Sequence, residues 1–183
     1  MIKYELTKLQ KNIFVFLCEN VGKTINQTDL AKALGVSAAA VVKAMPGIKN
    51  LVDVKRVGRI NLLTIELNRS IQKNLYKKRV ENLGQLYESG VVDYLKESSP
   101  GSTIILFGSY SRGEDIFSSD IDIAIVNAKS KKLKLNKYDK ILGKTINISF
   151  YESFKIDKPL KENLCNGIVL SGGVELWRHL MSI

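Results

Sequence analysis

The sequence predicts an α/β (α+β) fold in two parts, a small mixed-sheet domain preceded by a smaller module of helices and one β-hairpin. The sheet is predicted by two apolar, β-branched runs, Thr103–Phe107 and Asp120–Val126, which are separated by a Gly-Ser turn. The first module is predicted by apolar residues at helical spacing, followed by two strand-like runs. The predicted parts are 1–68, a helical linker with the first helix of the next domain over 69–98, and the sheet domain over 99–183.

The first module begins with helices. Apolar residues recur at helical spacing over 4–19. In the phrase Thr28–Ser37 a short helix ends at a glycine-containing turn, and Ser37 takes the N-cap position of the next helix. This next helix is predicted over Ala38–Met45, because Pro46-Gly47 ends it.

Two strand-like runs complete the first module. They extend over 51–57 and 60–67 and are joined at Gly58, which predicts a hairpin. Three helices and a hairpin in this order, with the phrase Leu-Ala-x-x-Leu-Gly-Val-Ser, resemble a winged helix-turn-helix domain.

DNA binding is one interpretation of this module. The helix over Ala38–Met45, which would be the recognition helix, offers few groups that read base edges. The hairpin turn carries cationic side chains suited to phosphate contacts. The alternative is a module that dimerises or docks the second domain, and both interpretations stay open. Since helix-turn-helix modules often dimerise, a homodimer is also expected. The candidate DNA-binding residues are Ser37, Lys43, Lys55, Arg56 and Arg59.

The remaining elements belong to the linker and the sheet domain. Residues 69–98 predict one long helix or two helices that meet at Ser89-Gly90. A lysine-dense loop over Lys129–Lys137 leads into a short helix, and a strand follows over Thr145–Phe150. The last predicted element is a helix around Pro159–Ser171.

The turn after the first sheet strand carries residues suited to phosphate and metal chemistry. Gly108 and Ser109 open a helix, whose free backbone N–H groups and dipole favour a phosphate. Asp120 and Asp122 lie two residues apart in a strand and therefore share a face. Two neighbouring carboxylates repel each other, and a divalent cation is the usual reason for their proximity. The pattern predicts metal-assisted chemistry on a nucleoside triphosphate.

The pattern Gly-Ser-x-x-Arg-Gly, a short spacer and Ser-Asp-x-Asp resembles the signature of the DNA polymerase β-like, minimal nucleotidyltransferase family. The resemblance covers about residue 85 to the C-terminus. It implies that Asp120 and Asp122 are catalytic and hold Mg²⁺ or Mn²⁺, and that Gly108 and Ser109 bind the phosphates of an NTP. Arg112 either contacts phosphate or braces the loop. The implied reaction moves an NMP from the NTP to a hydroxyl of a partner protein, an RNA end or a small molecule.

The later strand departs from the family pattern. The family's third metal carboxylate aligns with Asn147, whose amide oxygen is a weaker ligand because it adds no negative charge. Three alternatives follow: Glu152 or Asp139 substitutes, the enzyme works slowly with one well-bound ion, or the domain binds nucleotide without transferring it. The chain is accordingly interpreted as an enzyme or as a DNA-binding regulator or antitoxin-like protein with a degenerate nucleotidyltransferase domain.

The composition indicates which classes of binding partner and which cellular compartment to expect. The formal net charge is +10, and residues 1–68 hold ten Lys/Arg against five Asp/Glu. This balance favours polyanions such as nucleic acid or nucleotides, or serves solubility alone. No apolar run approaches the ~20 residues of a membrane span, so no membrane partner is expected. Cys18 and Cys165 lie among apolar neighbours and are interpreted as buried thiols, which predicts a cytoplasmic protein.

Overall fold

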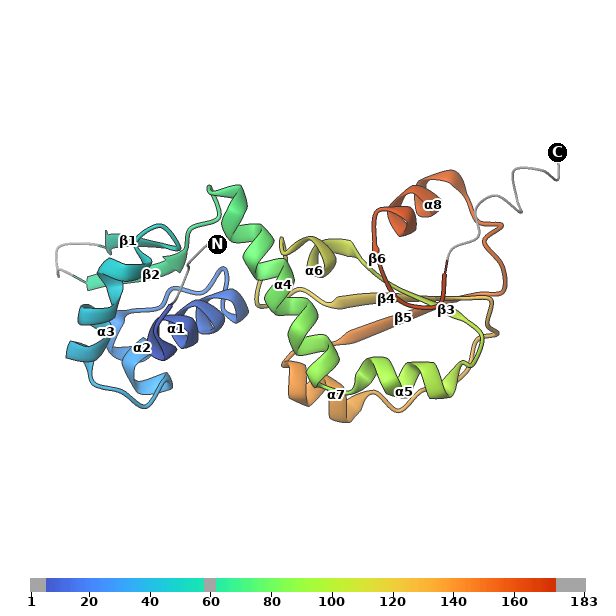
Figure 1. The fold of residues 1–183 in the computed structure, drawn as a ribbon, viewed down its shortest axis with the longest axis horizontal. Helices are drawn as coiled ribbons and strands as arrows, with labels where there is room; N and C mark the ends of the chain where they lie inside the picture. The colour runs from blue at the N-terminus through green and yellow to red at the C-terminus, as the bar shows by residue number, and fades with distance from the viewer. Residues whose placement is uncertain (1–5, 58–61, 174–183) are drawn as a thin grey trace. The chain divides into compact units, whose positions relative to one another are not determined.

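The chain divides into two compact units, Met1–Lys78 and Arg79–Ile183. The computed structural model describes residues 6–57 and 62–173 (Figure 1). The division falls within helix α4, Gln72–Glu88, whereas the sequence predicts boundaries at 68 and 98. The first turns of α4 therefore go with the first unit.

The first unit contains helices followed by an antiparallel hairpin. Side-chain caps start the helices: Thr7 Oγ1 accepts a hydrogen bond from Gln10 N at 3.3 Å, and Ser37 Oγ accepts one from Ala40 N at 3.1 Å. The predicted N-cap role of Ser37 is confirmed. The elements are α1 Lys8–Glu19, α2 Gln27–Ala33, α3 Ala38–Ala44, the 3₁₀ helix η1 Met45–Ile48, β1 Val52–Val57 and β2 Leu62–Leu67.

Helix α3 ends at Ala44, within one residue of the predicted end before Pro46, and a 3₁₀ helix that was not predicted follows. Pro46 lies in the first turn of η1, where proline's missing N–H leaves no hydrogen bond unmade. The chain therefore turns from α3 directly into η1 before it reaches the hairpin.

One apolar cluster holds the first unit together. Buried side chains of α1, α2, α3 and β2 meet in it, among them Leu17, Leu30, Val41 and Ile65. The order of elements agrees with the predicted order, and the identity of the unit as a winged helix-turn-helix domain stays a prediction. In the described part of the chain no single helix has the length and composition to cross a membrane; α2 and Ala38–Ile48 satisfy that test only as a pair bent by 104°.

The second unit is built on a four-stranded mixed sheet with the order β5-β4-β3-β6. Strands β4 and β5 are parallel, and β3 runs antiparallel to both of its neighbours. This arrangement confirms the predicted fold class. The strands are β3 Thr103–Phe107, β4 Ile121–Val126, β5 Ile146–Tyr151 and β6 Ile168–Ser171, and the helices after α4 are α5 Val91–Ser98, α6 Gly108–Arg112, α7 Asn136–Leu142 and α8 Lys158–Cys165.

The two faces of this sheet pack against different helices. On one face, Ile121, Ile123 and Ile125 pack with buried residues of α4, α5 and α7. On the other, Ala124 and Val126 pack with Leu164 of α8, and Figure 1 shows α8 on the side of the sheet opposite to α5 and α7. Because side chains alternate along a strand, Asp122 lies on the same face as Ala124, the face that α8 covers.

The end of the described chain differs from the prediction. Residues 159–171 are predicted as one helix, but α8 ends at Cys165 and β6 follows, pairing with β3. Gly167 makes this return possible, because a Cβ there would lie 2.6 Å from the Leu106 carbonyl oxygen. Cys165 is exposed rather than buried, whereas Cys18 is buried as predicted. The predicted break at Gly90 is confirmed by its left-handed φ of 76° between α4 and α5.

Candidate active site

The turn from β3 into α6 comes very close to the second carboxylate. Gly108 has a φ of 76°, and a Cβ built on it would lie 2.6 Å from Asp122 Oδ2. A side chain at position 108 would therefore meet both backbone strain and a carboxylate. No side chain caps the N-terminus of α6 among the residues that the structure describes. Ser109 follows as a half-buried residue of this short helix.

The sheet places the carboxylates beside this turn. Asp122 lies in β4, paired with Phe107 of β3 on one side and with Asn147 of β5 on the other. Asp120 directly precedes β4 and is exposed. The C-terminal end of β3 and the N-terminal ends of β4 and β5 thus meet at one edge of the sheet.

Asn147 bridges the two carboxylates. Its Nδ2 donates to Asp120 Oδ2 at 3.1 Å and makes a longer contact with Asp122 Oδ1 at 3.5 Å. The three residues predicted as metal ligands are therefore neighbours, and the two carboxylates turn toward the same point, as their i, i+2 spacing predicts. The alternative ligand Asp139 is engaged elsewhere, because its Oδ1 accepts from Ile146 N at 3.0 Å.

The donor set fits one divalent cation better than two. Two carboxylates and an amide oxygen are hard ligands of the kind that Mg²⁺ and Mn²⁺ accept. Within residues 6–57 and 62–173, His, Cys, Asp and Glu side chains form no group of three or more that is able to hold a metal ion. A site of this composition carries two negative charges from Asp120 and Asp122, where a third carboxylate would add one more.

Arg112 pairs with an acidic residue of the loop after α6. Its Nε lies 2.7 Å from Glu114 Oε2, and both side chains are about half exposed. This pairing agrees with the bracing alternative for Arg112. The neighbouring helix positions are internal, since Tyr110 and Ser111 are buried and Ser111 Oγ donates to the Gly108 carbonyl at 2.8 Å.

Three polar residues that sequence reasoning did not select lie beneath the loop. Asn82, Asp115 and Lys144 come from α4, from the loop before Asp120 and from the segment before β5, and the side chains of Asp115 and Lys144 are almost completely buried. Their sequence context carries no sign of this, because charged residues next to strand ends and in loops are usually exposed.

The candidate DNA-binding residues belong to the first unit and are only partly described. Ser37 caps α3, and Lys43 is exposed in the last turn of that helix. Lys55 Nζ pairs with Glu66 Oε2 across the hairpin at 3.1 Å. The backbone of Arg56 lies in β1, its side chain is not described, and Arg59 lies outside the described residues. No common surface for these five residues is therefore established.

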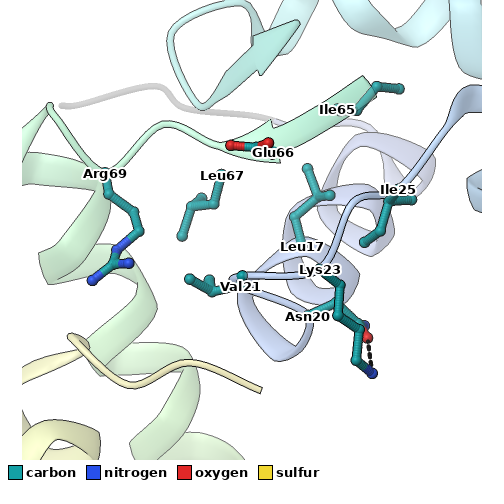
Figure 2. Close-up of a pocket in the computed structure, with 10 residues that line it drawn as sticks. Leu17, Asn20, Val21, Lys23, Ile25, Ile65, Glu66, Leu67 and Arg69 are labelled. Atoms are coloured by element: carbon teal, nitrogen blue, oxygen red, sulfur yellow. Dashed lines mark hydrogen bonds between the residues drawn. The ribbon is translucent and has the colours of Figure 1, made fainter. Parts of the chain in front are cut away.

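The first unit also contains a small cavity between α1 and β2. Figure 2 shows apolar side chains along its walls, with Asn20, Lys23 and Arg69 at its polar margin. Its volume is about 120 Å³. Lys23 Nζ donates to Asn20 Oδ1 at 2.9 Å. None of the residues predicted as functional lines this cavity.

The comparison with protein families bears on the second unit. Residues 88–169 match the family model described as nucleotidyltransferase domain. No significant match to a curated protein was found. The matched segment includes the β3–α6 turn, both carboxylates and Asn147, and it leaves out the first unit. Residues 88–169 are therefore similar to a nucleotidyltransferase domain, which supports a general nucleotidyl transfer function for the second unit.

Proposed function

We propose that this protein is a metal-dependent nucleotidyltransferase that moves an NMP from an NTP to a hydroxyl acceptor. The observation that supports it best is the meeting of Gly108, Asp120 and Asp122 at one edge of the sheet. The glycine lets the backbone approach the Asp122 carboxylate closely, and a triphosphate needs both backbone donors and a cation nearby.

The residues of the site have distinct roles in this proposal. Backbone N–H groups of Gly108 and Ser109 bind the β- and γ-phosphates, while Asp120 and Asp122 hold Mg²⁺ or Mn²⁺. The ion, when bound, neutralises phosphate charge and polarises the phosphoryl oxygens. In the reaction the acceptor oxygen forms a bond to the α-phosphorus, the bond from that phosphorus to the pyrophosphate oxygen breaks, pyrophosphate leaves, and the proton of the acceptor hydroxyl passes to solvent.

Asn147 weakens the site for a second cation. Its amide nitrogen faces both carboxylates, and it must turn its oxygen toward a cation to act as a ligand. Since this oxygen carries no formal charge, we expect nucleotide binding to be retained more fully than transfer.

The test is Mg²⁺-dependent binding of ATP, GTP, CTP and UTP by calorimetry, together with pyrophosphate release in a cell extract that supplies acceptors. Wild type is compared with N147D and with D120N/D122N. We expect wild type to bind at least one NTP with Mg²⁺, N147D to release pyrophosphate about tenfold faster or more, and D120N/D122N to lose the Mg²⁺-dependent part of binding.

The matched control is D93N/E97Q, which removes two exposed acidic groups from α5 of the same unit. It should bind nucleotide like wild type. Unchanged Mg²⁺-dependent binding in D120N/D122N would show that the proposed metal site is wrong. Binding without pyrophosphate release in wild type, but with release in N147D, would favour a nucleotide sensor over an enzyme.

A second candidate function is a DNA-binding regulator or antitoxin-like protein whose second unit binds nucleotide without turnover. The helix order of the first unit and the exposed Lys43 on α3 support it. The other exposed side chains of α3 are small or apolar, including Val42, which favours phosphate contacts over base reading. Binding to duplex DNA across a salt series tests it: a steep salt dependence supports a polyanion surface, and no binding at low salt excludes the regulator.

The acceptor and the assembly state are part of the same proposal. A partner protein is one of three acceptor classes, beside an RNA end and a small molecule, and a homodimer is the proposed assembly. An α-³²P-labelled NTP separates the acceptor classes by the size and protease sensitivity of the labelled product. Light scattering of the purified chain measures the assembly state.

A further inference from the structure

A lysine ammonium lies buried beneath the loop that leads to Asp120. Lys144, just before β5, has a side chain that is 7% exposed, and its partner Asp115 is 1% exposed. Lys144 Nζ lies 3.4 Å from Asp115 Oδ2. Since burying a charge is costly unless it is paired and hydrogen-bonded, such a pair needs further partners.

The loop supplies these partners from its backbone. Lys144 Nζ donates to the Ile116 carbonyl at 2.6 Å and to the Ser119 carbonyl at 3.3 Å, with a longer contact to the Phe117 carbonyl at 3.5 Å. An ammonium has three protons to donate. The loop from α6 to Asp120 therefore directs several of its carbonyl groups at the Lys144 ammonium.

The buried carboxylate ties this loop to two helices. Asp115 Oδ1 accepts from Asn82 Nδ2 at 2.8 Å, and the same Nδ2 donates to the Tyr110 carbonyl at 3.0 Å. The Tyr110 hydroxyl in turn donates to the Asn82 carbonyl at 3.2 Å. Through Asn82 and Asp115, α4 and the phosphate-side helix α6 are joined to the group that Lys144 contacts.

The lysine also stands in fixed relation to the other side of the site. It lies three residues before Asn147, and the next residue, Thr145, accepts a backbone hydrogen bond from Ile121 N at 2.8 Å. Asp120 is thus held between the Ser119 carbonyl, which Lys144 contacts, and Ile121, which β5 pairs. The position of the loop determines where Asp120 lies relative to Asn147.

We propose that Lys144, with Asp115, is a positioning residue that sets the placement of Asp120 and Asp122 relative to the Gly108–Ser109 turn. The alternative is a buried ion pair that stabilises the unit as a whole without a particular effect on the loop. The catalytic meaning of this placement rests on the proposed nucleotidyltransferase function, but the placement itself is measurable without it.

The experiment compares K144M with the double variant K144M/D115N. The single variant leaves the buried carboxylate without the lysine, whereas the double variant removes both charges and keeps an amide oxygen as acceptor for Asn82. The matched control is K140M, which removes an exposed ammonium from α7. Amide hydrogen exchange, followed by NMR, measures the stability of the loop at Ile116, Ser119 and Ile121. The N–H groups of these residues donate hydrogen bonds within the loop or to the Thr145 carbonyl.

We expect K144M to lower the midpoint of thermal unfolding, and we expect K144M/D115N to have a midpoint close to that of wild type. Its loop amides should still exchange about tenfold faster than in wild type, with the β4 amides of Ile123 and Ile125 unchanged. Wild-type exchange of the loop amides in the double variant would overturn the proposal, and so would equal acceleration in loop and sheet. K140M should match wild type throughout.

A second readout connects the loop to the site. Mn²⁺ added to the protein should broaden the amide signals of Gly108 and Asp122, and the Mn²⁺ concentration for half-broadening should rise about tenfold in K144M/D115N. Loop acceleration without this rise would overturn the positioning role. If wild type shows no broadening by Mn²⁺, the proposed metal-dependent function fails, and exchange alone then decides whether Lys144 holds the loop.

Discussion

Two lysine–carboxylate pairs, one in each unit, differ in burial far more than in length. Lys55 and Glu66 are 3.1 Å apart with side chains 61% and 41% exposed, whereas Lys144 and Asp115 are 3.4 Å apart and almost fully enclosed. The shorter pair lies in high dielectric and its contribution to stability is small, because water and salt screen both charges. The longer pair is the one whose disruption leaves a charge in the interior. Distance alone therefore ranks these two interactions in the wrong order.

The surroundings of the pairs explain the difference. The Lys55 pair spans two strands of an exposed hairpin, while Lys144 also contacts the carbonyls of a loop and reaches Asn82 through Asp115. In the first unit the Lys55 ammonium lies on the surface. In the second unit the Lys144 ammonium contacts the backbone of the loop beside the candidate site. Four substitutions test this contrast.

K144M should have the largest effect on stability. Removing one partner of a buried pair costs about 3–5 kcal/mol, and the loss should appear in the opening free energy of the second unit. Native-state hydrogen exchange of the most protected β4 amides measures it, and amides of α1 report whether the first unit stays unaffected. A loss below about 1 kcal/mol would place the pair in the same class as Lys55–Glu66.

G108A should come next, with a loss of about 2–3 kcal/mol in the second unit, because an L-residue at positive φ costs ~1–2 kcal/mol and its Cβ would collide with Asp122. Mg²⁺-dependent nucleotide binding should weaken with it. G35A in the first unit is the control, since Gly35 has a φ of 64° and its Cβ would meet nothing within 4 Å. Equal losses for G108A and G35A would contradict a close approach of turn and carboxylate.

S37A should lower the stability of the first unit by about 1 kcal/mol, because it removes the side-chain cap of α3. Exchange of α3 and α1 amides measures the loss. S37T keeps a hydroxyl and should retain most of the stability. An unchanged first unit in S37A would mean that the cap contributes nothing to α3.

K55M should have the smallest effect, within about 1 kcal/mol, since its pair with Glu66 is exposed. The residual effect should shrink further at high salt, whereas the loss in K144M should persist, because buried charges are screened less. A salt-independent loss of several kcal/mol in K55M would remove the contrast between the units.

The features predicted well are those set by neighbouring residues. Ser37 was identifiable because an N-cap acts within three residues, and the break at Gly90 because glycine adopts a left-handed φ readily. Strands β3 and β4 follow from short β-branched runs. Asn147 was selected through the family resemblance, and the parallel pairing of β4 and β5 places it beside Asp122. The roles of these residues and the metal stay predictions.

The features that were missed depend on distant parts of the chain. Ile168–Ser171 is a strand because β3 offers it an edge, with Leu106 opposite Ile168; the run itself is short and follows a helix. The burial of Asp115 and Lys144 results from the packing of α4, the loop and β5 around them, and no local pattern distinguishes them from surface charges. The 3₁₀ helix η1 was missed as well, because Pro46 in its first turn marks the end of α3 but is also compatible with a new helical turn.

The enclosed ammonium of Lys144 has a consequence for how the site meets its ligands. A loop whose conformation depended on a bound, dissociable cation would unfold locally when a chelator or a low ionic strength removed that cation. Here the cation is covalently part of the chain, so the loop keeps its shape whatever ions the solvent contains. If the proposed function holds, metal and nucleotide would meet a preorganised site, and little of their binding energy would be consumed in ordering the backbone that carries Asp120.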